Sequence, residues 1–298
     1  MAVKRYTLPG WVYIVLAATM WSTSGFFTRA IAAPPLVVVV LRAAFAGICL
    51  APFIRPKQIH WDKKLVLLIV AYAFTSSTYI FAMQFTSAAN TVALHYTAPL
   101  WVYLWTICLV KHTSWRQVLP MAIILAGVII CLLEPSSGAN IMGNWVALAS
   151  GAGFAWLTVC IARMGGQNSL GIISLCNLLT VPILLPLVAL WPGSSLALFA
   201  QLTTRQWLLG LCFGAFQLGF SYGAYFIGLQ TVKPQKATIL SLMELVLTPV
   251  WVFLFMGEKP SLYGLICWLL IIAGLLSEAL LKPQWDEANK PTSLRSSS

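Results

Sequence analysis

The chain has 298 residues, of which 60% are hydrophobic and only 8% charged, and its mean hydropathy is +0.86. A soluble domain carries roughly 25% charged residues, so this composition indicates an integral membrane protein whose partner is the lipid bilayer. The net charge of +11 comes from basic residues scattered over short segments. Nucleic acid binding needs a contiguous basic surface, so no nucleic acid partner is expected.

Ten apolar stretches follow one another along the chain, and each has the roughly 20 residues that a helix needs to cross a bilayer. They cover approximately residues 9–29, 34–54, 64–84, 89–110, 115–134, 143–163, 169–191, 206–229, 235–257 and 261–281. They divide into two successive sets of five. Because five is odd, a second copy of the same unit must sit upside down in the membrane, which is typical of secondary transporters.

The sequence therefore predicts an all-α integral membrane protein with ten transmembrane helices arranged as two inverted five-helix repeats. The first repeat is expected over residues 1–139 and the second over 140–282. The tail over 283–298 is rich in serine and charge and is expected to be disordered. Residues 146 positions apart share few identities, so the repeat rests on matching hydropathy, similar loop lengths, and Pro99 and Pro249 in the fourth helix of each half.

The basic residues predict the orientation of the chain. Of the 18, fourteen precede the first stretch, follow an even-numbered stretch or lie in the tail, whereas Arg29, Arg205 and Lys259 fall on the opposite side. The positive-inside rule then places both termini in the cytoplasm of a multi-pass protein in a bacterial-type cytoplasmic membrane. Lys4 and Arg5 before the first stretch also resemble a signal peptide, but we expect this stretch to be retained because its removal would leave nine spans.

Arg42 and Glu244 are the charged residues predicted to lie deepest in the membrane. A rise of about 1.5 Å per residue places each roughly 12–13 Å from the start of its helix, close to the midplane. A charge there costs on the order of 2.5–3.5 kcal/mol, so each is expected to face a partner or a cavity. Arg42 suits a solute site or a clamp onto backbone carbonyls. Glu244 suits solute binding, proton coupling or a permanent ion pair with Arg42, because burial favours a neutral carboxyl and a nearby arginine a charged one.

Several uncharged residues are further candidates for the same site. Asn177, near the middle of the seventh stretch, suits either a polar solute or an interhelical hydrogen bond. His95 suits either a proton-coupling role or a packing hydrogen bond. Aromatic side chains at depth can wall a cavity and hold a cation, or can simply pack between helices. The aromatic candidates for substrate binding are Trp21, Tyr79, Trp101, Trp156 and Tyr225.

Motifs of enzymes and metal sites are missing from the sequence. The seven cysteines lie within the apolar stretches, with no CxxC pair and no histidine at a metal-ligand spacing, so they are expected to pack as small apolar residues. No HExxH helix, Gly-rich phosphate loop or Ser-His-Asp arrangement is found. We therefore expect no metal, no cofactor and no enzymatic activity.

Four segments together resemble the EamA-type exporters of the drug/metabolite transporter superfamily, over about residues 8–282. They are Trp21-Ser22, Leu41-Arg42, YTAPLWVYL at 96–104 and SLMELVLTPVWVFLFMGEKPS at 241–261. Gly257-Glu258 matches the Gly-Glu pair that closes the ninth helix in this family. Leu245 stands where the family has proline after Glu244, and His112 stands where the first half often has glutamate. The resemblance implies the ten-helix fold and an outward direction of transport.

The leading hypothesis is a secondary transporter that exports a small organic metabolite, an amino acid or a related amphipathic compound, with protons as a possible coupling ion. A zwitterion would place its carboxylate toward Arg42 and its ammonium toward Glu244. The alternative is a broad exporter of cationic compounds or multiple drugs, which would need Glu244 and tolerate neutralisation of Arg42. A uniporter or a channel is a further alternative.

Overall fold

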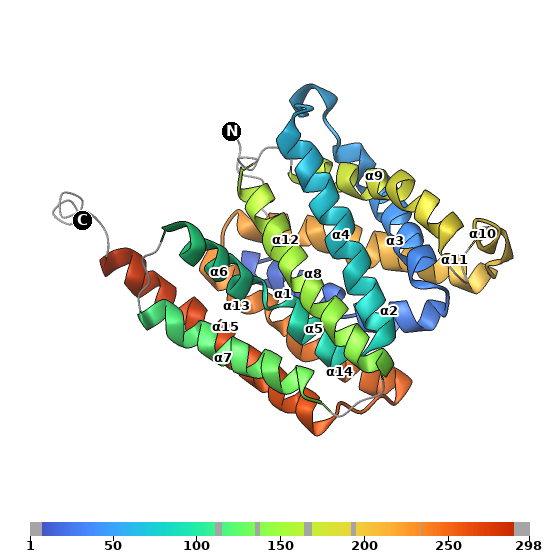
Figure 1. Cartoon of the computed structure of the whole chain (residues 1–298). Coiled ribbons are helices and arrows are strands. Elements are labelled where there is room, and N and C mark those ends of the chain that lie inside the picture. Colours follow the sequence, from blue (N-terminus) through green and yellow to red (C-terminus); the bar gives the residue numbers. More distant parts are fainter. Residues whose placement is uncertain are drawn as a thin grey trace.

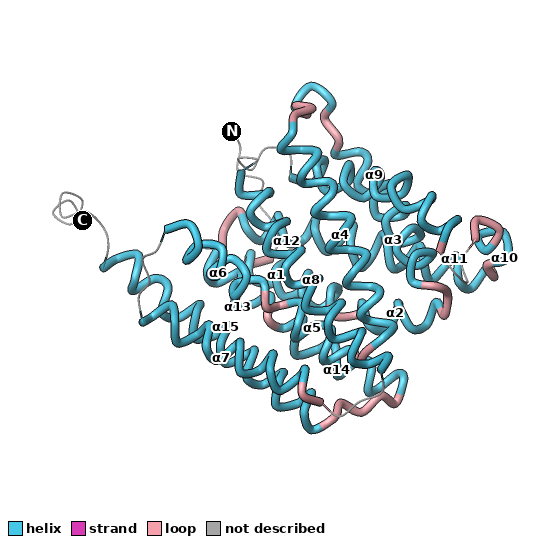
Figure 2. Tube along the Cα trace, in the orientation of Figure 1, coloured by secondary structure: helices cyan, strands magenta, loops and turns pink. Residues whose placement is uncertain are grey.

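The computed structural model describes residues 8–110, 115–134, 138–163, 169–191, 195–232 and 234–288, and these contain helices and no strand. The α-helices form one bundle joined by short loops (Figures 1 and 2). They are α1 (Gly10–Trp21), α2 (Ser24–Ile31), α3 (Pro35–Leu50), α4 (Lys63–Phe85), α5 (Ala88–His95), α6 (Ala98–Val110), α7 (Trp115–Leu132), α8 (Gly138–Arg163), α9 (Ser169–Leu190), α10 (Leu198–Gln201), α11 (Thr204–Leu211), α12 (Ser221–Leu229), α13 (Pro234–Ser241), α14 (Met243–Met256) and α15 (Leu262–Ala288). Two short 3-10 turns, η1 (Ala51–Phe53) and η2 (Pro56–Gln58), follow α3, and a π-helix, η3 (Cys212–Phe220), joins α11 to α12.

Seven of the helical stretches in the described residues are long and apolar enough to cross a membrane. They are Pro35–Phe53, Lys63–Phe85, Ile141–Ile161, Ser169–Leu190, Thr204–Leu229, Ile239–Met256 and Leu262–Leu281. An apolar helix over Val118–Leu132 is shorter. Helices also occupy the predicted stretches 9–29 and 89–110, but each of these is divided into two. The protein is thus an all-helical membrane protein.

The expectation of continuous helices is wrong at three places, where the chain leaves helical geometry in the middle of a predicted span. The first break, at Ser22 and Thr23, separates α1 from α2. Both hydroxyls donate 2.6 Å hydrogen bonds to carbonyls of the preceding turn, an interaction that bends helices. The other breaks lie at Tyr96 and Thr97 between α5 and α6, and at Leu242 between α13 and α14. These common residue types carry no breaking signal in the sequence.

Two further irregularities lie in the second half of the chain. The predicted stretch 206–229 contains the π-helix η3, which adds a residue to each turn and which no glycine or proline pattern predicts. Pro249 lies inside α14 and removes the hydrogen bond to the carbonyl of Leu245. That carbonyl accepts a 2.8 Å hydrogen bond from Trp268 Nε1 of α15 instead.

The last described helix continues past the predicted end of the tenth stretch. α15 continues to Ala288, so the first residues of the stretch 283–298 are helical and not disordered. The segment contains good helix formers such as glutamine, glutamate and alanine, although Pro283 removes one backbone hydrogen bond of the helix. Residues 289–298, like most of the basic residues near the termini, lie outside the described residues.

Pairs of neighbouring helices come from opposite halves of the chain. α4 packs along α8, α7 along α15, α3 along α9, and α1 along α12 (Figure 1). The pair α3 and α9 is locked by Ser174 Oγ, which donates to the carbonyl of Gly47 at 2.7 Å. Among the seven candidate spans of the described residues, the one that contains α3 has the largest buried share, and its side chains from Leu36 to Ala43 are all buried.

Gly214 lets η3 approach α3. A Cβ at this position would lie 2.6 Å from the carbonyl oxygen of Arg42 and 2.7 Å from the backbone nitrogen of Ala46, whereas a Cβ at Gly223, nine residues further on, meets nothing within 4 Å. We therefore expect Gly214→Ala to destabilise the protein by about 1–3 kcal/mol through overpacking. Gly223→Ala, the matched control, should be neutral or stabilising, because alanine favours a helix. Thermal unfolding of the detergent-solubilised variants measures both, and equal melting temperatures would contradict the prediction.

Candidate functional site

A cavity of about 800 Å³ lies inside the bundle. This volume is within the range of roughly 300–1,000 Å³ that is usual for small-molecule sites. Each of the three helix breaks contributes to its wall, through Trp21 at the end of α1, Tyr96 between α5 and α6, and Leu242 between α13 and α14. Irregular backbone at membrane depth is tolerated where it lines a cavity, and broken helices are typical of transporter binding sites.

The structure brings six of the sequence-predicted residues to this cavity, from helices in both halves of the chain. They are Trp21, Arg42, Tyr79, His95, Tyr225 and Glu244. The two charged residues, far apart in the sequence, therefore share one cavity.

Arg42 lines this space and has two hydrogen-bond donors without partners. Its side chain is buried, and its guanidinium carbon lies 4.8 Å from the ring centroid of Phe213 in η3. A cation over an aromatic face is stabilised by about 0.5–2 kcal/mol. Nε and Nη1 are buried and have no hydrogen-bond partner, so the predicted clamp onto backbone carbonyls is wrong for these two atoms. A buried donor without a partner costs about 1–3 kcal/mol, which a bound acceptor would recover.

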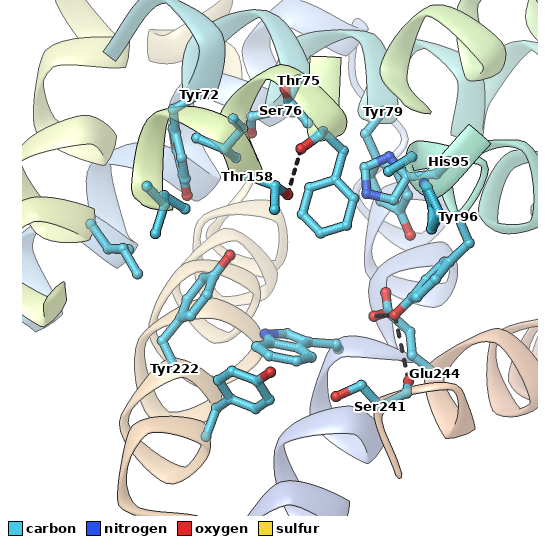
Figure 3. A pocket seen from close by; sticks show the side chains of 18 of the residues that line it. Tyr72, Thr75, Ser76, Tyr79, His95, Tyr96, Thr158, Tyr222, Ser241 and Glu244 are labelled. Atoms are coloured by element: carbon cyan, nitrogen blue, oxygen red, sulfur yellow. Dashed lines mark hydrogen bonds between the residues drawn. The ribbon is translucent and has the colours of Figure 1, made fainter. Parts of the chain in front are cut away.

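Glu244 lies in the first turn of α14, just after the break at Leu242. Tyr96 OH donates a 2.6 Å hydrogen bond to Glu244 Oε2 and lies 3.5 Å from the carbonyl oxygen of Ser241 (Figure 3). Tyr96 comes from the corresponding break in the first half, so one hydrogen bond joins the two breaks. Glu244 forms no ion pair with Arg42 among the contacts of the described residues, and the predicted permanent pair is therefore absent from this conformation.

An aromatic cluster forms another part of the wall. The ring of Trp21 lies 5.3 Å from that of Tyr222 and 5.1 Å from that of Tyr225, in edge and tilted geometries. Trp21 Nε1 is buried and has no hydrogen-bond partner. The cluster thus combines an apolar surface and ring faces that attract a cation with one unused donor.

His95 is held by packing contacts. Nδ1 lies 2.7 Å from Ser150 Oγ of α8, and the ring stacks on Phe154 at 4.7 Å and meets the edge of Tyr79 at 4.8 Å. This is the packing hydrogen bond that was one of the two predicted roles. Tyr79 is fixed in turn by a 2.7 Å hydrogen bond with Ser24 of α2.

Asn177, Trp101 and Trp156 do not line the cavity, contrary to the prediction. Asn177 is fully buried in α9 behind Tyr72, and its Nδ2 donates to the carbonyl of Ile173 at 2.9 Å, so its own helix uses the amide. Trp156 packs against the smaller core cluster, and Trp101 against the larger one. Position within a span does not tell which way a side chain points, and that caused these errors.

Other lining residues were missed, although a helical period marks many of them. Tyr72, Ser76 and Tyr79 stand at the i, i+4, i+7 spacing of one face of α4, and Tyr222, Tyr225 and Phe226 share a face of α12. Figure 3 shows Tyr72 and Tyr222 on one side of the cavity and Glu244 and Ser241 on another. Gln217 and Glu278 also line it.

The cavity extends toward one end of the bundle. Its lining includes Ile161, Ser169, Leu229 and Leu281, which lie at or near the ends of α8, α9, α12 and α15. At the opposite end, Arg29 of α2 and Glu258 form an ion pair of 2.8 Å. The space is therefore asymmetric along the helices.

Comparison with known proteins identifies the family. The model of the EamA-like transporter family matches twice, at residues 8–133 and at residues 141–277. The chain belongs to the EamA-like transporter family. It is therefore a membrane transporter protein by family, and the sequence-based assignment to EamA-type proteins is confirmed.

Individual relatives are distant but match along nearly their whole length. The chain is 26% identical to the threonine/homoserine exporter RhtA of Escherichia coli strain K12 over 284 residues, 92% of this chain and 93% of that protein. It is 27% identical over 264 residues to an uncharacterised transporter of Archaeoglobus fulgidus, 88% of this chain and 93% of that protein. A solved protein crystal structure has the same fold, with a TM-score of 0.64 over 91% of this chain and 97% of that chain at 18% identity.

Proposed function

We propose that this protein is a secondary transporter that exports a small organic metabolite, an amino acid or a related amphipathic compound, by alternating access. The observation that carries the proposal is the shared cavity, in which buried Arg42 keeps two donors without partners while Glu244 faces the same space. Ionisable groups at membrane depth are costly and mark solute or ion pathways. A distant relative is named an exporter of threonine and homoserine, which supports this solute class and direction.

A zwitterionic solute matches the chemistry of the cavity. Its carboxylate would lie at the guanidinium of Arg42, and its ammonium group would donate to Glu244. Its side chain would lie against Trp21, Tyr222 and Tyr225.

The proposed topology has ten spans in two inverted repeats, over residues 1–139 and 140–282. Three findings support it. The family model matches once in each half. The helix breaks at Tyr96 and Leu242 lie 146 residues apart and so occupy equivalent positions. Exchanging the two halves of the chain maps the pair α4 and α8 onto the pair α12 and α1. The same exchange maps the pair α3 and α9, and the pair α7 and α15, onto themselves.

With both termini in the cytoplasm, the cavity of this conformation opens inward. The proposed topology places Ile161, Ser169, Leu229 and Leu281 on the cytoplasmic side. Solute would enter there and reach Arg42 and Glu244, and it would leave after the opposite end has opened.

Cysteine tags test the orientation. We expect Gln58→Cys in η2 to react with a membrane-impermeant maleimide only after the cells are permeabilised, and Lys259→Cys after α14 to react in intact cells, because the basic segments predict opposite sides for them. Labelling of native cysteines is subtracted with the parent protein. The reverse pattern would contradict the topology.

Counterflow in proteoliposomes tests transport and the role of Arg42. A carrier preloaded with unlabelled neutral amino acid should transiently accumulate the labelled form, which a channel cannot do. We expect Arg42→Met to raise the half-saturating concentration at least about tenfold, since hydrogen bonds to charged groups contribute about 1.5–3 kcal/mol. Arg205→Met, which neutralises an exposed arginine of α11, is the matched control. If Arg42→Met instead preserves transport of organic cations, the alternative of a cationic-compound exporter is favoured, which the aromatic cluster and Glu244 would also serve.

Glu244 is the proposed proton-coupling group, because a group of this kind must be neutral in one state and charged or solute-bound in the other. We expect Glu244→Gln to abolish transport driven by a pH gradient while solute exchange at equal pH persists. Glu278→Gln removes another carboxyl of the same cavity, near its mouth, and should leave both activities. If the Glu244→Gln protein responds to the pH gradient as the wild type does, the proton-coupling group is His95 or the protein is a uniporter.

A further inference from the structure

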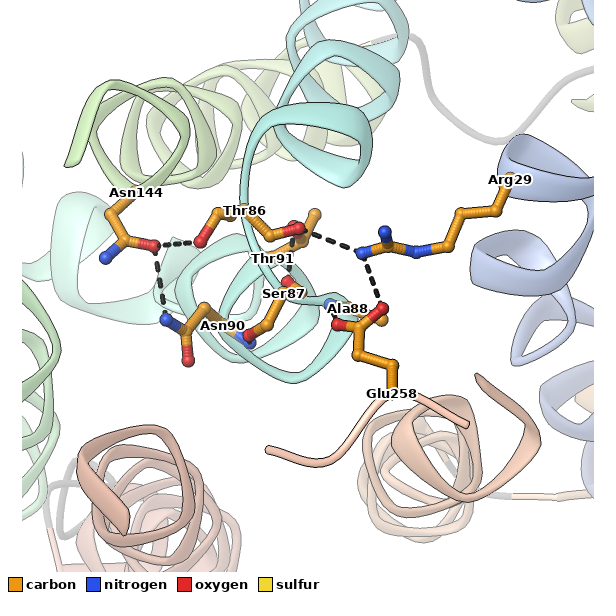
Figure 4. A network of polar contacts seen from close by, with 8 residues as sticks. All are labelled: Arg29, Thr86, Ser87, Ala88, Asn90, Thr91, Asn144 and Glu258. Atoms are coloured by element: carbon orange, nitrogen blue, oxygen red, sulfur yellow. Dashed lines mark hydrogen bonds and ion pairs between the residues drawn. The ribbon is translucent and has the colours of Figure 1, made fainter. Parts of the chain in front are cut away.

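The end of the bundle opposite the cavity mouth carries a network of polar contacts (Figure 4). Arg29 Nη2, in the last turn of α2, lies 2.8 Å from Glu258 Oε2 and donates to the carbonyl of Thr86 at 3.0 Å. Glu258 Oε1 accepts a 3.0 Å hydrogen bond from the backbone N–H of Ala88. One arginine and one glutamate thus tie together the end of α2, the turn between α4 and α5, and the segment after α14.

A buried part of the network is centred on Asn144 of α8. Thr86 Oγ1 donates to Asn144 Oδ1 at 2.6 Å, and Asn90 Nδ2 lies 3.3 Å from the same oxygen and 2.9 Å from Glu134 Oε2. Thr86 belongs to both parts, because its side chain binds Asn144 and its carbonyl binds Arg29. The contacts therefore form one connected set across this end of the bundle.

We propose that this network is the outer gate of the transporter, and that separation of Arg29 from Glu258 opens the cavity to the extracellular side. The inference rests on the proposed alternating-access function, in which this end faces outward. Each key contact joins the two repeats: Arg29 belongs to the first and Glu258 to the second, and Thr86 to the first and Asn144 to the second. A motion that parts the outer ends of the repeats must break these contacts.

The exposure of the pair suits a reversible contact. The side chains of Arg29 and Glu258 are 26% and 24% exposed. Water can therefore solvate both groups when they separate, which is not possible for a fully buried pair without a large desolvation cost. Salt also screens such a pair, so the gate responds to external ionic strength.

Helix α5 connects this gate to the cavity. Glu258 binds the N–H of Ala88 at the first position of α5, a donor that has no partner within the helix, and its charge is favourable at that end of the helix dipole. At the other end of α5, Tyr96 binds Glu244 in the cavity. A change at Glu244 can therefore move one end of a helix of only eight residues whose other end holds the gate.

Accessibility of a cavity cysteine tests the gate without any solute. Thr158→Cys places a thiol on α8 in the cavity lining. In intact cells, an impermeant maleimide reaches it only when the outer end is open. Arg29→Ala and Glu258→Ala each remove the ion pair together with a hydrogen bond to the turn between α4 and α5. We expect either change to raise the labelling rate about tenfold, which corresponds to about 1.4 kcal/mol of bias toward the open state. High external salt should raise labelling of the parent and have little effect on these variants.

Arg205→Ala is the matched control, because it removes a basic residue that is predicted on the same side and lies outside this network, and it should label as slowly as the parent. The conservative change Arg29→Lys should label more slowly than Arg29→Ala, because lysine keeps the charge and can donate to both Glu258 and the carbonyl of Thr86. Rates are normalised to the amount of tagged protein at the cell surface. If the alanine variants do not reach the cell surface, the labelling rate of the near-isosteric Glu258→Gln variant is measured instead.

Labelling of the Arg29→Ala and Glu258→Ala variants at the Arg205→Ala rate would overturn the proposal, as would labelling of Arg29→Lys as fast as that of Arg29→Ala in a protein that reaches the surface. A different result would reject the proposed transport function. Absence of counterflow with any solute would reject the transporter function while a clear gate response remained, and normal counterflow with unchanged labelling would reject the gate alone.

Discussion

The absence of water from the hydrocarbon core is the constraint on which this structure depends. A helix that is interrupted there must have its freed backbone groups satisfied by other parts of the protein. At the break after α1, the carbonyl of Trp21 accepts from Gln217 Nε2 at 3.0 Å, and Ser22 Oγ accepts from Trp251 Nε1 at 2.8 Å. At Pro249, Trp268 serves the freed carbonyl. These two interruptions therefore exist together with a partner side chain on another helix.

These partners connect the two halves of the chain as well as satisfying the backbone. Gln217 and Trp251 belong to the second half and bind the junction of α1 and α2 in the first. The hydrogen bond between Tyr96 and Glu244 likewise crosses from one half to the other. Because Trp21, Tyr96, Leu242 and Gln217 all line the cavity, the contacts that stabilise the breaks also determine where the cavity lies.

Hydropathy was sufficient to locate the helical stretches, because the bilayer requires long apolar segments whatever their packing. It could not locate the breaks, since Ser22, Thr23 and Leu242 are also compatible with an intact helix. The cost of a charge in lipid correctly selected Arg42 and Glu244 as cavity residues. This cost does not indicate which way a neutral side chain points. Asn177, Trp101 and Trp156 were therefore assigned to the cavity incorrectly.

The helical period could have corrected part of this error, since Tyr72, Ser76 and Tyr79 follow one face of α4. The network at the other end was less accessible to sequence reasoning. Gly257-Glu258 is recognisable as a motif, but the partner of Glu258 is Arg29, more than two hundred residues away. Such a pairing depends on tertiary structure and leaves no local signal.

The magnitudes indicate that the proposed outer gate cannot control transport alone. An exposed ion pair such as Arg29 with Glu258 contributes roughly 0–1 kcal/mol, whereas a shift from 1:99 to 99:1 between two states needs about 5.5 kcal/mol. The remainder must come from groups whose interactions change with the solute. Arg42, with its unpaired donors, and Glu244, bound only by Tyr96 among the hydrogen bonds found for its carboxylate, are the groups in the described residues suited to that role. In the proposed mechanism, α5 has Tyr96 at one end and the Glu258 contact at the other, so the weak outer contact would set the resting state and the stronger cavity contacts would drive its release.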